Sequence, residues 1–187
     1  MIDVLQLVQS LRYALRDMQG VKISDFELIE CINQAASLLY VTMAEKYVRY
    51  ALKTYTMDVG DANKGVLPDD FLKVHQVLTD EDTVAVPTSY LPTTDGTYRI
   101  KGNMFYANND VYSIEYYYVP KRVKSLSDKL DVQTAMSPYI EQVALAFYGN
   151  NLDKAKKVVD ICVTSLSDIE VSHFENVGPT QVLGGRV

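Results

Sequence analysis

The sequence predicts an α+β fold: an antiparallel helical bundle of about four helices with an inserted small antiparallel β-domain. Apolar residues recur at helical spacing near both ends of the chain, over residues 2–18 and 152–166. Between them, Tyr98 to Val119 follows the period of two that is typical of strands. The predicted units are residues 1–46 for an N-terminal helical hairpin, 47–124 for the β-domain, 125–175 for the C-terminal helices, and 176–187 for an extended tail.

Composition and charge limit the possible classes of protein. At 187 residues with a net charge of −6, the chain is long enough to bury a core but too acidic for a general nucleic-acid binder, which needs a basic face. Cys31 and Cys162 fall inside predicted helices without a CxxC partner, which favours buried side chains over a metal site or a disulfide. No basic leader and no apolar run of roughly 18 residues is present, so we expect a soluble, non-secreted protein without membrane contact.

The N-terminal helices are marked by local signals. Residues 2–18 place their apolar side chains on one helical face, and Gly20 ends the pattern. Ser24 followed by Glu27 is a capping box, which predicts a second helix. Because residues 19–23 form only a short link, the two helices are expected to be antiparallel neighbours.

The β-domain is predicted from composition and turns. Tyr, Val and Thr become frequent over residues 47–59, which predicts a first strand. Tyr98 to Tyr106 is typical of a hairpin that turns at Gly102-Asn103, and residues 111–119 are expected to pair next to it. Farther along the chain, Ser137 is a predicted N-cap, and Gly149-Asn150-Asn151 separates the last two helices.

The tyrosines of the last strand suggest one alternative function. Tyr112, Tyr116 and Tyr118 share a face, so the strand is consistent with a nucleic-acid- or glycan-binding module that stacks bases or sugars, with Lys121 and Arg122 beside it. Tyrosine is also frequent in half-buried strands and protein interfaces. The acidic composition favours this second interpretation.

Residues capable of chemistry do not form a known motif. His75 and His173 lie outside any nucleophile, metal-ligand or nucleotide-binding pattern, so the sequence predicts no enzyme, no cofactor and no metal. A hydrolase that uses Asp69, Asp70 and His75 is a further alternative, based on residue types alone.

Three phrases of the sequence resemble one protein family. They are Leu67-Pro68-Asp69-Asp70-Phe71, the hairpin Tyr98-Arg99-Ile100-Lys101-Gly102-Asn103, and the strand end Tyr116-Tyr117-Tyr118 with Pro120. Together with the late helix that contains Ala144-Leu145-Ala146, the arrangement resembles the tailed-bacteriophage head-to-tail adaptors, or connectors, of the tail tubular protein A type.

This resemblance implies a structural virion protein of the neck or tail, assembled in the host cytoplasm. About a dozen copies, a dodecameric ring, would sit between the portal protein and a tail or nozzle protein and line the channel through which genomic DNA passes without specific binding. The C-terminal tail would bind the portal through Thr180, Gln181, Val182, Leu183, Gly184, Gly185 and Arg186. Lateral or tail contacts would use Tyr112, Tyr116, Tyr118, Arg99 and Tyr106.

From composition alone, the tail has two open interpretations. It carries three glycines and one proline after residue 177 and no helical period, which predicts a flexible segment. Thr180 to Leu183 could instead add as a strand to a sheet edge of another molecule.

Overall fold

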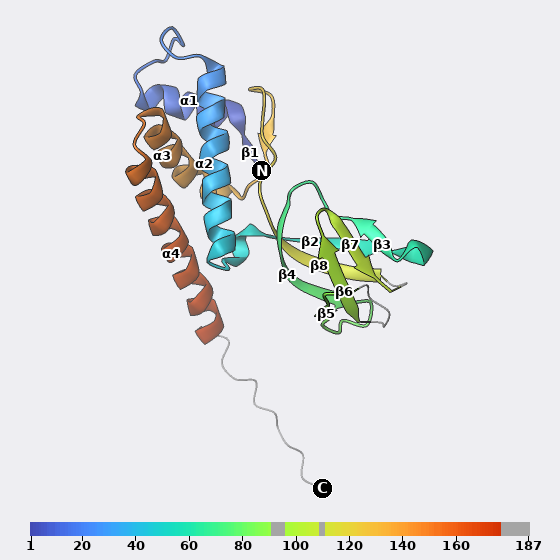
Figure 1. Ribbon diagram of the computed structural model, residues 1–187. Coiled ribbons are helices and arrows are strands. Elements are labelled where there is room, and N and C mark those ends of the chain that lie inside the picture. Colours follow the sequence, from blue (N-terminus) through green and yellow to red (C-terminus); the bar gives the residue numbers. More distant parts are fainter. Residues whose placement is uncertain (91–95, 109–110, 177–187) are drawn as a thin grey trace.

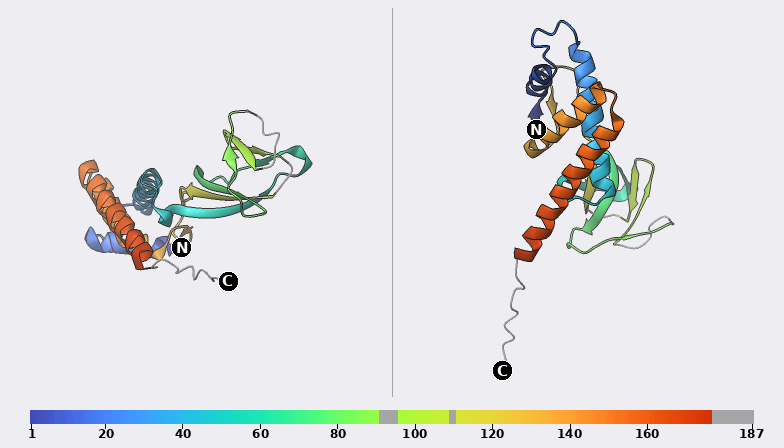
Figure 2. Two further views of the ribbon diagram at one scale, coloured as in Figure 1. Left: turned by 90° about the horizontal axis from the view of Figure 1, so that it is seen from below. Right: turned by 90° about the vertical axis from the view of Figure 1, so that its left-hand side faces the viewer.

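The computed structural model describes residues 1–90, 96–108 and 111–176. Figure 1 shows a group of helices on one side and the larger sheets on the other, and the left view of Figure 2 shows the same separation. The seven residues proposed as a portal contact, Thr180 to Arg186, lie outside the described residues.

The helical side contains all four α-helices of the described residues. They are α1 (Val4–Ala14), α2 (Asp25–Glu45), α3 (Ser137–Tyr148) and α4 (Leu152–Asn176). The helix α3 runs opposite to α2 and α4, and their facing side chains, among them Ile32, Leu39, Ile140 and Val159, are buried. No helix in the described ranges combines the length and the apolar character needed to cross a bilayer.

Local sequence signals predicted some helix ends correctly and others incorrectly. The capping box is confirmed: Ser24 Oγ accepts from Glu27 N at 3.2 Å, and Glu27 Oε2 accepts from Ser24 N at 2.9 Å. The first helix ends earlier than expected, at Ala14, because Arg16 adopts a left-handed backbone with φ 55°. The resulting longer link lets α1 cross α2 at a steep angle, so the predicted antiparallel pairing is wrong (Figure 1). Ser137 is the first residue of α3 rather than its N-cap, since a short 3₁₀ turn precedes it.

Nine strands form three sheets among the described residues. The first sheet pairs β1 (Ile2–Asp3) with β9 (Lys129–Leu130). The second has the order β2 (Leu52–Asp58), β8 (Val111–Tyr118), β4 (Phe71–Thr79), and is antiparallel throughout. The third has the order β3 (Lys64–Val66), β7 (Met104–Ala107), β6 (Thr97–Lys101), β5 (Val86–Pro87). Short 3₁₀ turns occupy Arg49–Ala51, Gly60–Ala62 and Thr134–Met136.

These sheets overturn the predicted fold of a helical bundle with a small inserted β-domain. The chain is α+β with four helices among the described residues, but its strand content is too large for that description. One sheet also joins the chain's start to residues 129–130, in the unit expected to hold the C-terminal helices. The hairpin β6–β7 is confirmed, yet β8 pairs with β2 and β4 instead of with the hairpin. Pairing partners that are distant in sequence leave no local signal, which explains the error.

The two larger sheets pack against each other through aromatic rings. Phe105 on β7 stacks on Tyr98 with centroids 5.6 Å apart and meets Tyr112 on β8 edge-on at 5.4 Å. Gly65 on β3 lies so close to the buried Met57 on β2 that a Cβ there would be 2.3 Å from Met57 Sδ. The sheets therefore share one core, and the helices contact it where α2 meets β4 and β8.

Candidate functional site

Lys53 links three elements at the junction between the helices and the sheets. Its Nζ lies 2.7 Å from Asp70 Oδ2, just before β4, and 2.5 Å from Asp131 Oδ2, in the segment that leads to α3. The same ammonium lies 3.9 Å from the centre of the Tyr118 ring. These contacts join residues far apart in the chain and hold the sheets at a defined position beside the helices.

Electrostatics keep this junction ionised. Burial would lower the pKa of Lys53, but the hydrogen bonds to Asp131 and Asp70 outweigh it and raise the pKa. Burial would raise the pKa of Asp70, and the hydrogen bonds from Lys53 and Tyr116 outweigh it, so that pKa is lowered. Neither group is poised to exchange a proton near neutral pH, which indicates a structural role rather than acid–base catalysis.

The tyrosine hydroxyls complete the junction. Tyr116 OH donates to Asp70 Oδ1 at 3.0 Å, and Tyr118 OH donates to the Asp131 carbonyl at 3.1 Å and lies 3.4 Å from Tyr40 OH. Burial, followed by its hydrogen bond to Asp70, raises the pKa of Tyr116; burial and the contact with Tyr40 raise the pKa of Tyr118. Both hydroxyls stay protonated donors.

The structure places three of the predicted interface tyrosines inside the subunit. Tyr112, Tyr116 and Tyr118 do share a face of β8, but they are 0%, 3% and 4% exposed. Phe105 and Phe71 cover two of the rings. Because the subunit's own core covers these rings, an interface would use other residues.

The two cations expected beside a stacking face are committed to internal pairs. Lys121 Nζ lies 3.4 Å from Asp69 Oδ2, and Arg122 pairs with Glu30 on α2. The alternative of a base- or sugar-stacking platform therefore loses its rings, whereas Lys121 and Arg122 keep side chains that are 69% and 64% exposed.

Arg99 and Tyr106 lie on the outer face of the third sheet. They are direct cross-strand partners and half-buried, and Lys64 on β3 is the next residue in the same row. Because side chains alternate along a strand, all three point away from the Phe105 core. These two predicted residues remain open to contact with another molecule.

The residues of the hydrolase alternative do not converge. Asp70 is engaged by Lys53 and Tyr116, whereas Asp69 is exposed and pairs with Lys121. His75 Nδ1 lies 3.4 Å from Tyr117 OH, on an exposed part of β4. Within the described ranges no three or more His, Cys, Asp or Glu side chains form a group that could hold a metal ion.

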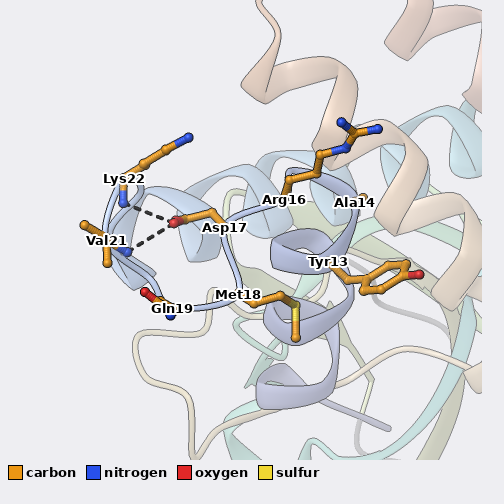
Figure 3. Close-up of a pocket in the computed structure, with 8 residues that line it drawn as sticks. All are labelled: Tyr13, Ala14, Arg16, Asp17, Met18, Gln19, Val21 and Lys22. Atoms are coloured by element: carbon orange, nitrogen blue, oxygen red, sulfur yellow. Dashed lines mark hydrogen bonds between the residues drawn. The ribbon is translucent and has the colours of Figure 1, made fainter.

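A hollow of about 820 Å³ lies at the link between α1 and α2 (Figure 3). Residues from the end of α1 and from the link line it: Tyr13, Ala14, Arg16, Asp17, Met18, Gln19, Val21 and Lys22. Tyr13, Met18 and Val21 are well exposed, with 76%, 64% and 78% of their surface accessible. The sequence predicted only a short link between the two helices and gave no indication of this hollow.

Asp17 gives the link its shape. Its carboxylate is 5% exposed and accepts from the backbone N–H groups of Val21, Lys22 and Ile23 at 3.1, 3.2 and 3.0 Å. Arg12 Nη1 donates to the same carboxylate at 2.9 Å. Burial acts to raise the pKa of Asp17, yet these backbone donors and Arg12 outweigh it and lower the pKa. The charged group thus fixes the loop.

Comparison with known proteins returned no family model and no curated protein that matches the chain.

Proposed function

We propose that this chain is a structural adaptor of a tailed bacteriophage, which assembles as a ring between the portal and the tail and surrounds the path of the genomic DNA. The proposal starts from the resemblance of its sequence phrases to the head-to-tail adaptors. Those phrases begin and end defined elements: Leu67 to Asp70 leads into β4, and the Gly102-Asn103 turn joins β6 to β7.

The distribution of exposed apolar side chains carries the proposal. Tyr13, Met18 and Val21 gather at the link between α1 and α2, with Phe26 following in the first turn of α2 at 69% exposure. On the sheet side the large exposed apolar residues include Tyr55, Val66, Leu72, Val84, Val86 and Tyr90. Large apolar side chains exposed on both sides of a subunit are consistent with contacts between proteins, which a ring subunit needs on more than one side.

The use of charge supports the same function. Lys53, Asp70 and Asp131 hold the parts of the subunit together, and Arg12 with Asp17 holds the helical link. These ionised groups fix a rigid shape rather than open a reactive pocket. The net charge of −6 suits a conduit that must not retain the DNA passing through it.

Co-purification with the portal protein of the same genome tests the proposal. The purified chain is mixed with assembled portal, and the mixture is followed by sedimentation velocity and negative-stain electron microscopy. We expect a complex larger than the portal alone, with an added ring at one end. A chain that stays monomeric and never sediments with portal would contradict the proposal.

A titration with fluorescent single-stranded DNA at low salt is the matching control. A conduit should show no salt-sensitive binding, because Tyr112, Tyr116 and Tyr118 are buried and the protein is acidic. Tight, salt-sensitive binding would favour the nucleic-acid-binding alternative instead.

A further inference from the structure

The link between α1 and α2 presents an apolar surface with positive charge. We call residues 13–22 the helical tip. Arg16 and Lys22 on this tip form no ion pair with any residue that the structure describes, and both extend upward from the loop in Figure 3. The nearby carboxylates, Asp17 and Asp25, both pair with Arg12, at 2.9 and 2.5 Å. The tip thus offers two unpaired cations beside Tyr13, Met18 and Val21.

The helical tip is rigid before any partner arrives. Asp17 holds three successive backbone N–H groups, and Arg12 Nη2 also donates to the carbonyl of Ile23 at 3.0 Å. A surface already fixed in its binding shape loses little conformational entropy on association. The exposed apolar residues of this loop are therefore a prepared contact surface rather than a mobile link.

A negatively charged surface, opposite in sign to the helical tip, lies just after the end of β4. Asp80, Glu81 and Asp82 are exposed and form no ion pair within the described part of the chain. We call residues 80–82 the acidic turn. Val84 and Val86, which follow it, are 64% and 60% exposed. Negative charge and apolar surface thus occur together here, as positive charge and apolar surface do at the helical tip.

The acidic turn is also built rigidly. Thr79 N donates to the Thr83 carbonyl at 2.9 Å, and the two threonine hydroxyls lie 2.7 Å apart. Asp82 takes a left-handed backbone with φ 57°, and its N–H donates to the Thr79 carbonyl at 3.1 Å. These bonds close the turn and direct its carboxylates outward.

The two surfaces lie at opposite ends of the subunit. Phe71, at the start of β4, pairs with Tyr118 near the junction, and Thr79, at its end, pairs with Tyr112. Eight residues of strand separate these ends by roughly 25 Å. The helical tip lies beyond the junction on the helical side (Figure 1). The tip therefore cannot meet the acidic turn of its own chain.

We propose that the helical tip of one copy binds the acidic turn of a second copy, with Arg16 and Lys22 facing Asp80, Glu81 and Asp82, and with the exposed side chains of both surfaces packed together. Two different surfaces then meet in a head-to-tail contact, which continues from copy to copy and closes as a ring where the rotation permits. The contact rests on the proposed function, for which it supplies the lateral interface, and charge complementarity selects its partner.

Charge reversal tests the pairing. R16E/K22E should weaken self-association, measured by sedimentation velocity, by about tenfold or more, since it turns attraction to the acidic turn into repulsion. E81K/D82K should do the same, and the four changes combined should restore association. The control K156E/K157E makes the same change of charge on the exposed surface of α4 and should have little effect. An equal loss in the control, or no rescue in the combined variant, overturns the pairing.

Disulfide cross-linking tests the geometry directly, and it captures contacts too weak to persist in sedimentation. In a background with Cys31→Ser, the variants R16C and E81C are mixed at about 1 mM and oxidised. We expect a cross-linked pair from the mixture, and a ladder of oligomers from the double variant R16C/E81C. The absence of a cross-link between the two positions, or links only between two copies of position 16, overturns the head-to-tail contact.

The outcome for this contact is separable from that of the adaptor function. If R16E/K22E still forms rings on the portal with normal yield, the contact is wrong and the adaptor proposal stands. If R16E/K22E loses portal binding but keeps self-association, the helical tip binds the portal and the contact between copies is wrong. If R16C and E81C cross-link with each other but the unaltered chain never binds portal, the contact stands and the adaptor proposal fails.

Discussion

Asn33 is expected to be a principal polar link between α2 and the chain that leaves the sheet. Its side chain is 4% exposed; Nδ2 donates to the Val123 carbonyl and Oδ1 accepts from Val123 N, both at 2.9 Å. Asn33→Ala leaves a buried donor and a buried acceptor without partners, since Val123 is itself 6% exposed. At about 1–3 kcal/mol for each group, we expect a loss of about 3 kcal/mol in the free energy of unfolding.

A second substitution sharpens this prediction. Asn33→Asp keeps the acceptor but places a carboxylate oxygen against the Val123 carbonyl, so at neutral pH the loss should equal or exceed that of the alanine variant. Burial against the Val123 carbonyl raises the pKa of the new carboxyl, and its protonated form supplies the missing donor. The aspartate variant should therefore recover stability as the pH falls, whereas the alanine variant should not.

Urea denaturation followed by circular dichroism measures both effects. The exposed neighbour Gln34 provides the control, because Gln34→Ala removes a polar side chain of similar size without uncovering a buried partner. A loss for Asn33→Ala no larger than that of Gln34→Ala would show that the two hydrogen bonds do not hold α2 to this segment, and the reasoning would be refuted.

Three other substitutions test separate contacts. Because the pKa of Asp70 is lowered from 3.8, its carboxylate stabilises the folded state above that pH, and this contribution is lost as the pH falls. In Asp70→Asn the urea midpoint should therefore fall less steeply between about pH 6 and 3 than in the unaltered protein. Gly65→Ala should lower the melting temperature, with a cost of about 1–3 kcal/mol, since its Cβ would lie 2.3 Å from Met57 Sδ, and adding Met57→Ala should recover part of the loss. Gly20→Ala should cost about 1 kcal/mol in urea, because φ is +67° and the new Cβ would lie 3.2 Å from the Arg12 guanidinium; a neutral result would contradict the strained turn.

The elements that could be predicted are those with local causes. Ser24 and Glu27 cap α2 through bonds three residues apart, and the Gly102-Asn103 turn joins two adjacent strands, so both were readable from the sequence. The break after Tyr148 was likewise predicted by Gly149-Asn150-Asn151. Each depends on neighbours in the chain, which a sequence displays directly.

What the sequence could not supply depends on partners far away in the chain. Period two correctly placed Tyr112, Tyr116 and Tyr118 on one face of β8, but it contained no information on the layers that bury them. Lys53 meets Asp131 at a separation of 78 residues, and Asn33 meets Val123 at a separation of 90. The tyrosines therefore looked like a contact surface, although they belong to the core and the junction.

The helical tip shows why a candidate surface was also missed. Helical periodicity continued through Leu15 and Met18, so the sequence predicted an unbroken helix where Arg16 instead turns the chain. Asp17 accepts hydrogen bonds from backbone N–H groups four to six residues ahead, which is typical of an ordered loop. An acidic residue shortly before Gly20 was the sequence signal that could have indicated this loop.

Cryo-electron microscopy of the chain bound to its portal tests the adaptor function most directly. We expect a closed ring at the distal end of the portal, in which the helices and sheets keep the relation set by Lys53 and each helical tip faces a neighbouring copy. Density for a single unattached subunit, or a portal whose end remains bare at saturating protein, would contradict the adaptor function.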